Sequence, residues 1–245
     1  AFDDGRVARL SPFAEAPLEF TSLAADSSRA FVAVGARYLA AYASSTKTFV
    51  FVAPSGEVAH SLTSSALARH GVGAMLAADV AGDTIVIVGG DANAVGEDAR
   101  AVTRVDVPTD VASAVSVSLT NLPATRWGAA VAWVDGTAEA ARMLVLGGQS
   151  ETSASDAFLI DPRGSGVVTV LPSAGLHHPD ATLLALGTGQ VLSVGGAAGS
   201  DVRLLIVATA PPSLTLASPS PPALAVARAR PRLVRFAYAL VLVLG

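Results

Sequence analysis

The chain has 245 residues, 51% of them apolar, which is enough to bury a sizeable core in one large domain or two small ones. Its formal net charge of −4 argues against a nucleic-acid binder, which needs a concentrated basic face, and the lack of cysteine excludes disulfides, cysteine-ligated metals and thiol nucleophiles. No apolar run reaches the roughly 18 residues that a membrane-spanning helix needs, and the first residues do not form a signal peptide.

The first part of the chain is rich in short apolar runs separated by turn residues. Residues 1–12 match a later segment that holds a third and a fourth strand, and they are predicted to do the same. The next repeat is expected to place its strands at 29–43, 48–54 and 57–62. This repeat is cryptic, because Ala43 and Ser44 stand where later repeats carry two glycines.

Several later runs of β-branched and apolar residues end in glycine. They occupy residues 84–90, 143–148, 191–196 and 240–245. The first glycines of these runs are Gly89, Gly147, Gly195 and Gly245, which are 58, 48 and 50 residues apart. This spacing indicates an internal repeat.

A second landmark keeps the same phase. A loop with arginine or histidine comes before a run of small and apolar residues, in segments 68–76, 125–131, 177–184 and, more weakly, 228–234. The third repeat displays the whole unit, with strands expected at 156–162, 167–172, 181–186 and 191–196. Two landmarks in one phase support a repeat better than paired glycines alone.

Four short strands per repeat, paired glycines after the second strand and an Arg/His loop before the first resemble degenerate Kelch repeats of bacterial type. The resemblance covers most of the chain. Kelch repeats also carry a tyrosine and a tryptophan after the paired glycines, and the 3 tyrosines and 2 tryptophans here are not in that register. The resemblance implies an all-β fold, a β-propeller of four-stranded antiparallel blades.

The two ends of the chain are predicted to complete one blade. A first and a second strand are expected at 231–236 and 239–244, and residues 1–12 supply the other two. Joined, they give five blades, with the N-terminal strands outside and the C-terminal strands inside, which removes open sheet edges. Residues 1–245 then form a single Kelch-like domain. The alternative is a part of a six- or seven-bladed ring.

The loop after strand two and the loop before strand one share a face, because antiparallel strands alternate in direction. The binding-face candidates in the Arg/His loops are Arg69, His70, Arg126, Trp127, His177, His178, Arg228 and Arg230. The glycine loops add Asp91, Asn93, Glu97, Asp98, Gln149, Glu151 and Asp201. In the functional interpretation this face grips a peptide carboxylate or a glycan. In the structural interpretation, which we favour, each Arg or His packs between blades and bonds backbone carbonyls.

The sequence contains no pattern typical of a metal site or a catalytic site. Adjacent residues on a strand point to opposite faces, so His177 and His178 are not expected to bind one ion together, and no metal or cofactor is predicted. A propeller oxidase with a cysteine-linked tyrosine is excluded by the lack of cysteine. A glycoside hydrolase needs convergent carboxylates, whereas the candidate acids lie mostly in outward loops. We therefore predict no enzyme, with a hydrolase or lyase in the central channel as the alternative.

The predicted function is a non-enzymatic scaffold that binds a protein or a glycan, with no nucleic-acid partner and no transmembrane segment. A charged fraction of only 15% favours a second alternative, a structural subunit of a larger assembly. The scarcity of lysine and cysteine in a Kelch-like chain indicates a bacterial protein of the extracellular space or the cell envelope.

Overall fold

The structure of the chain is a computed structural model. It describes residues 7–9, 18–20, 29–35, 37–79, 81–90, 98–134, 142–148, 156–163, 166–172, 181–187, 189–195 and 202–217. Within these residues all strand pairings are antiparallel. The helical elements of this part of the chain are short: α1 (Ser65–Ala68), η1 (Asp98–Arg100) and η2 (Val111–Ser113). None of the described helices is long and apolar enough to cross a membrane.

Four sheets of four strands follow one another along the chain, each with its strands in sequence order. Blade one contains β3 (Arg29–Val34), β4 (Tyr38–Ala43), β5 (Thr48–Val52) and β6 (Val58–Thr63). Blade two contains β7 (Met75–Ala78), β8 (Thr84–Val88), β9 (Val102–Asp106) and β10 (Val115–Ser118). Blade three contains β11 (Ala130–Val134), β12 (Arg142–Leu146), β13 (Asp156–Ile160) and β14 (Val168–Pro172). Blade four contains β15 (Ala181–Gly187), β16 (Gln190–Gly195), β17 (Val202–Thr209) and β18 (Pro212–Leu216).

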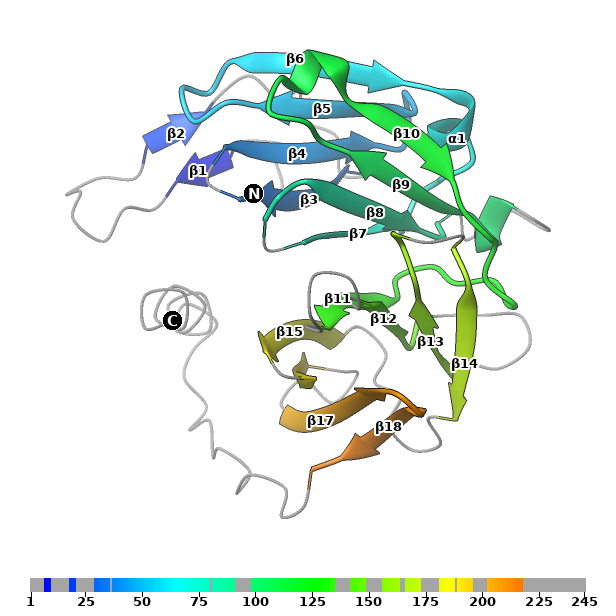
Figure 1. The fold of residues 1–245 in the computed structure, drawn as a ribbon. Coiled ribbons are helices and arrows are strands. Elements are labelled where there is room, and N and C mark those ends of the chain that lie inside the picture. The colour runs from blue at the N-terminus through cyan, green and yellow to red at the C-terminus, as the bar shows by residue number, and fades with distance from the viewer. Residues whose placement is uncertain are drawn as a thin grey trace.

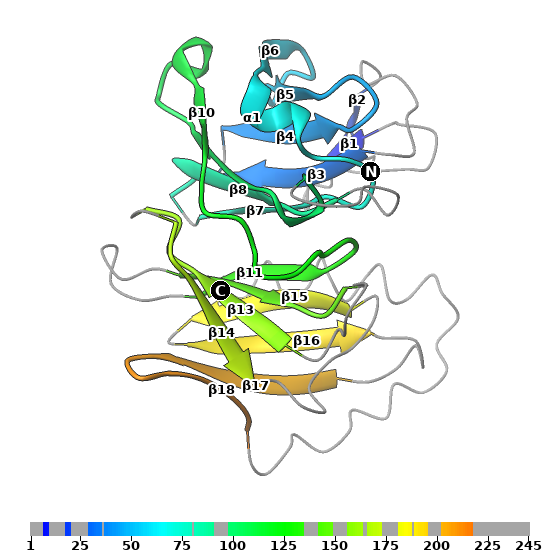
Figure 2. The same ribbon diagram turned by 90° about the vertical axis from the view of Figure 1, so that its right-hand side faces the viewer.

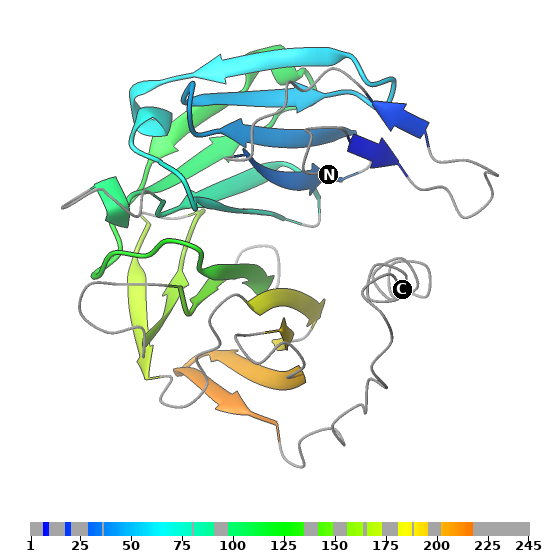
Figure 3. The ribbon, with the colours of Figure 1, turned by 180° about the vertical axis from the view of Figure 1, so that it is seen from behind.

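The four blades are arranged as an arc around a common centre (Figure 1). The first strands of neighbouring blades contact each other, β3 with β7, β7 with β11 and β11 with β15, so these strands lie on the inside. The fourth strands, β6, β10, β14 and β18, lie toward the outside. In the side and rear views, blades one and two lie above blades three and four (Figures 2 and 3). This is the radial arrangement of propeller blades.

An apolar core lies between each pair of neighbouring blades. Phe49 of blade one packs with Ile87 of blade two, Val86 of blade two packs with Met143 of blade three, and a third core joins blades three and four. All residues of β8 are buried because blade two is covered on both faces, which explains its continuous apolar sequence. Each fully buried Val, Leu, Ile or Phe side chain contributes about 1.5–3 kcal/mol, so these cores are the main stabilising force between blades.

The strand predictions for the described blades are confirmed. Strands β13 and β14 fall inside 156–162 and 167–172, and β15 and β16 match 181–186 and 191–196 to within one residue at each end. The strands predicted at 231–236 and 239–244 lie outside the described residues. Closure of a five-bladed ring and the extent of a single domain over 1–245 therefore stay predictions.

The N-terminal segment is described in part. Of residues 1–12, which are predicted to hold two strands, the structure describes residues 7–9, which form β1 (Val7–Arg9) and pair with β2 (Leu18–Phe20). The rest of the range 1–12 lies outside the described residues, so a second strand there stays a prediction. The pair lies beside one end of blade one (Figures 1 and 3).

Candidate functional site

The loop face is the side of the blades where the Arg/His loops meet the paired glycines. His70 Nδ1 lies 2.9 Å from the carbonyl oxygen of Gly89, within blade two. The amide of Gly90 donates to the carbonyl of Arg126 at 3.0 Å, which ties blade two to the loop that leads into blade three. The two sequence landmarks therefore meet on one face, as the strand directions predict.

The glycine landmark is explained by this close approach of loops. Gly89 has a φ of 59°, and a Cβ there would collide with the carbonyl oxygen of Arg126. A Cβ on Gly90 would lie 2.7 Å from the carbonyl oxygen of Gly71. Only glycine combines this positive φ with no side chain, so the paired glycines are needed for packing between loops.

His70 is fully buried and both of its ring nitrogens have partners. A carbonyl only accepts, so Nδ1 carries the proton toward Gly89, and Nε2 accepts from the hydroxyl of Thr103 at 2.8 Å. Burial lowers the pKa of His70 to about 4, against an ordinary value of 6.5, with the nearby charges of Arg69 and Lys47 also lowering the pKa. His70 is thus a neutral residue that holds loops together and has no ring nitrogen left for a ligand.

The backbone carbonyl of His70 is held as firmly as its ring. It lies 2.8 Å from the hydroxyl of Tyr42, which is also 2.7 Å from the carbonyl of Leu67, and it accepts from Nζ of Lys47 at 2.6 Å. Burial raises the pKa of Tyr42 well above its ordinary value, so the phenol stays a donor. These contacts bind the His70 loop of blade two to blade one.

Arg126 and Trp127 are placed differently from each other. The Arg126 guanidinium is buried, donates to the carbonyl of Thr125 at 2.8 Å and has its central carbon 4.7 Å from the ring centroid of Phe158. Trp127 is half-buried, and its Cβ lies so close to Gly73 that a Cβ added to this glycine would be 3.3 Å away. Arg126 is therefore built into blade three, and Trp127 is the more accessible of the two.

Arg69 lies at the surface of the loop face but is already engaged. Its Nε lies 3.3 Å from Oδ1 of Asp98, and a terminal nitrogen donates to the side-chain oxygen of Asn121 at 2.8 Å. The exposed pair with Asp98 contributes at most about 1 kcal/mol. Arg69 thus links the α1 loop to the two loops that flank β9 and β10.

The other predicted residues of the loop face lie outside the described residues. These are His177, His178, Arg228, Arg230, Asp91, Asn93, Glu97, Gln149, Glu151 and Asp201. Whether they bind a ligand stays a prediction. In the described part of the chain, no three His, Asp or Glu side chains come close enough to hold a metal ion.

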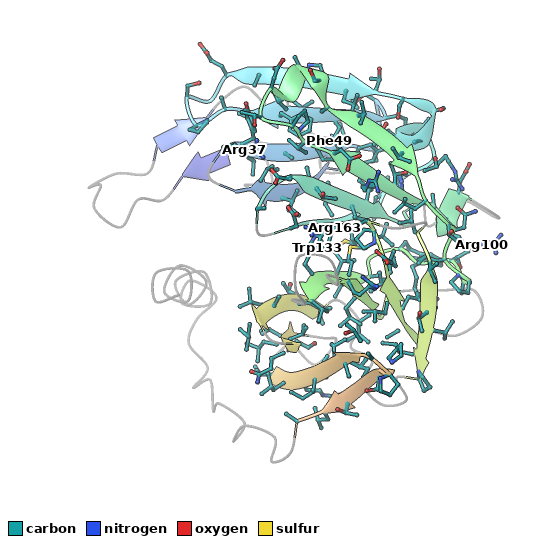
Figure 4. All side chains as sticks on the ribbon, viewed as in Figure 1. Arg37, Phe49, Arg100, Trp133 and Arg163 are labelled. Carbon is teal, nitrogen blue, oxygen red and sulfur yellow. The ribbon has the colours of Figure 1, made fainter. Side chains whose placement is uncertain are left out.

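The opposite side of the blades, which we call the turn face, carries a second set of charged contacts. Arg163 in the β13–β14 turn of blade three donates to Oδ2 of Asp79 at 2.7 Å and lies 5.7 Å from the ring centroid of Trp133. Figure 4 shows Arg163 and Trp133 side by side where blades two and three meet. Asp79 also accepts from the amides of Asp83 and Thr84. This buried carboxylate therefore joins a turn of blade two to blade three.

Arg37 makes the equivalent connection between blades one and two. Its guanidinium donates to the carbonyls of Gly82 at 2.6 Å and Pro108 at 3.2 Å, and to Oδ1 of Asp83 at 3.0 Å. The label in Figure 4 marks its place on blade one. Blades one and three thus each send an arginine to blade two on the turn face.

A groove of about 510 Å³ lies beside these contacts on blade two. It is lined by Asp83, Asp106, Val107, Pro108, Thr109, Ser113 and Val115. The side chain of Asp83 is 68% exposed, and Val115 is 53% exposed. The groove therefore combines accessible carboxylates with an accessible apolar wall.

The sequence interpretation missed the turn-face residues. Asp79 and Arg163 are 84 positions apart, and nothing in a single sequence pairs them. A weak signal was present, because a proline stands in both β9–β10 and β13–β14 turns, as Pro108 and Pro162, and each offers its carbonyl to an arginine of another blade.

Comparison with known proteins bears on the fold. No protein-family model and no curated protein matches the sequence, so the Kelch resemblance stays a prediction. The chain is similar to the β-propeller domain of Cps50 (Swd1) from Myceliophteria thermophila, with a TM-score of 0.54 and 12% identity over 84% of this chain and 65% of that chain. It also matches the structure of YjhT, with a TM-score of 0.47 and 15% identity over 74% of this chain and 52% of that chain. The chain spans less than two thirds of the length of either. The likeness to the Swd1 domain and the four antiparallel blades show the fold of a β-propeller.

Proposed function

We propose that this chain is a non-enzymatic binding scaffold, and that it holds a protein partner through the groove of blade two on the turn face. The partner would place a basic side chain against Asp83 and Asp106 and an apolar side chain against Val115. The observation that supports this proposal is the presence of accessible carboxylates and an accessible apolar wall in one groove. Mixed grooves of this kind suit protein segments.

The groove is held rigid by backbone hydrogen bonds. The amide of Val107 donates to the carbonyl of Asp83 at 2.8 Å, and the η2 turn is closed by bonds to Asp110, whose side chain accepts from the amide of Ala112 at 3.1 Å. A surface that is already ordered loses less entropy on binding. This rigidity supports a docking role.

The two carboxylates retain binding capacity. Oδ1 of Asp83 is paired with Arg37, and Oδ1 of Asp106 lies 2.9 Å from Nε of Arg104. Among the described residues, the Oδ2 atoms of both aspartates have no partner. A lysine or arginine of a partner would find an acceptor on each aspartate. On the loop face, by contrast, Arg69, His70 and Arg126 each donate a hydrogen bond to another group of the chain.

The test is selection of peptides from a random displayed library on the purified chain, followed by titration of single synthetic peptides. We expect the selected peptides to carry Lys or Arg next to an apolar residue, and their affinity to fall with salt. Asp83→Asn and Asp106→Asn should each weaken binding about tenfold. Glu57→Gln removes the same charge from an exposed turn of blade one and should leave affinity unchanged.

Two results would overturn the proposal. One is a set of selected peptides without basic residues, or with affinities insensitive to Asp83→Asn. The other is binding to a glycan array with no peptide selected. The hydrolase, lyase and assembly-subunit alternatives stay predictions.

A further inference from the structure

Blade four has two faces of different character. The face toward blade three carries Leu183, Val191 and Leu205, which are buried in the shared core. The other face carries Leu184, Leu192 and Leu204, which lie directly opposite one another on β15, β16 and β17. None of these three is buried, and Leu184 is 37% exposed.

The apolar character continues along the second face. Val194 and Val202 also lie opposite each other, and Ile206 follows Leu204 on the same side of β17. None of these side chains is buried either. We call these six residues, Leu184, Leu192, Val194, Val202, Leu204 and Ile206, the free face of blade four. Six aliphatic side chains on one face of a sheet, one exposed and five partly buried, form an apolar patch of the kind that marks an interaction surface.

The interfaces already present in the arc indicate what such a face binds. In each neighbouring pair the apolar face of one blade packs against the next blade in sequence, with the first strands side by side. The free face of blade four continues this series at the end of the arc (Figure 1). An occupant with the sequence of a first and a second strand therefore fits it.

The sequence after β18 contains such an occupant. Residues 233–244 are apolar except for Arg235, and they are followed by Gly245, which is 50 positions after Gly195 at the end of β16. With the same shift, Leu233 corresponds to Leu183 and Val241 corresponds to Val191, the side chains with which blade four packs on blade three. The pattern of the run thus matches the pattern of a docked strand pair.

We propose that the free face of blade four is the docking surface for residues 233–244 of the same chain, with Leu233 and Val241 directed at it. This interaction is independent of the groove on blade two. It would give the apolar face the same cover that the other blades receive. The competing occupants, a second copy of the chain or another protein, are distinguished by the test.

The lack of cysteine makes the test clean, since introduced thiols are the only ones in the chain. The variant with Leu184→Cys and Leu233→Cys is treated with a short bis-maleimide at low protein concentration and analysed by denaturing gel and peptide mass mapping. We expect a cross-link within one chain in most molecules. The matched control combines Leu233→Cys with Val58→Cys, which is 48% exposed on β6 of blade one, and should give at least tenfold less of this product.

A second measurement keeps the proposal falsifiable if the double variant folds poorly. Leu184→Cys alone should react with a monofunctional maleimide at least tenfold more slowly than Val58→Cys, because the docked segment shields it. Cross-links between two chains would assign the face to a second copy. Equal reaction rates for the two single variants would show an uncovered face. Either outcome would overturn the proposal.

Discussion

Arg163 of blade three donates to the carboxylate of Asp79 in blade two at 2.7 Å, although the two residues are 84 positions apart. The side chain of Asp79 is only 5% exposed and also accepts from the amides of Asp83 and Thr84. A single buried carboxylate thus closes a turn within its own blade and anchors the next blade.

Because of this arrangement, substitution of Asp79 should lower the free energy of unfolding more than substitution of Arg163. Asp79→Ala leaves two backbone amides and an arginine without an acceptor and should lower the free energy of unfolding by about 2–4 kcal/mol. Arg163→Met retains the amide bonds, and because Arg163 is one-third exposed its loss should cost only about 1 kcal/mol. Urea denaturation of both variants measures the difference. Equal losses would contradict the role given to the amide bonds.

His70 predicts a dependence of stability on pH. In the folded chain its pKa is lowered to about 4, whereas the unfolded chain binds the proton at about 6.5. Between these two pH values the unfolded state therefore binds more protons than the folded state. The contribution of neutral His70 to the free energy of unfolding is complete above pH 6.5 and is lost as the pH falls toward 4. The loss should reach roughly 3 kcal/mol.

The variant His70→Gln separates this effect from the titration of carboxylates. Glutamine offers one donor and one acceptor but does not titrate. The unfolding free energy of the variant should fall less steeply between pH 6.5 and pH 4 than that of the parent chain. Identical slopes would mean that His70 keeps an ordinary pKa in the folded state.

Gly89 and Gly128 have nearly the same φ but different surroundings, so their substitution by alanine should cost different amounts of stability. Gly89 has φ 59° and Gly128 has φ 62°, but a Cβ on Gly89 would meet the carbonyl of Arg126, while a Cβ on Gly128 would meet nothing within 4 Å. Gly128→Ala should therefore cost only the conformational strain, about 1 kcal/mol. Gly89→Ala should cost at least about 2 kcal/mol more, because the loop must move. Thermal unfolding of both variants checks the ranking.

The hydrogen bonds of Arg37 to backbone carbonyls should contribute more to stability than its ion pair with the exposed Asp83. Its contacts with the carbonyls of Gly82 and Pro108 should make Arg37→Ala cost about 1–2 kcal/mol. Asp83 is largely exposed, so the coupling energy in a double-mutant cycle of Arg37→Ala with Asp83→Ala should stay below about 1 kcal/mol. A coupling energy as large as the whole Arg37→Ala effect would show that the ion pair dominates.

Local sequence determined the strands of this protein. The alternation of apolar residues with turn residues places β13 and β14 correctly, because strand and turn preferences act over a few neighbouring residues. The landmark glycines were also found from sequence, because an internal repeat is visible as a fixed spacing. Their physical cause, the approach of Gly89 to Arg126, is a contact between loops and was not visible.

The tertiary structure alone decided which charged residues serve the fold. The sequence gathers His70 and Arg126 on one face, but only the packing of neighbouring loops shows that both are buried and that both donate to backbone carbonyls. Asp79 and Arg163 lie in separate repeats, so their ion pair forms only when the blades assemble and is not visible in the sequence. The burial of a side chain and the identity of its partners depend on contacts between residues that are distant in sequence. Local patterns determine the strands, and the assembly of the blades determines the environment of each side chain.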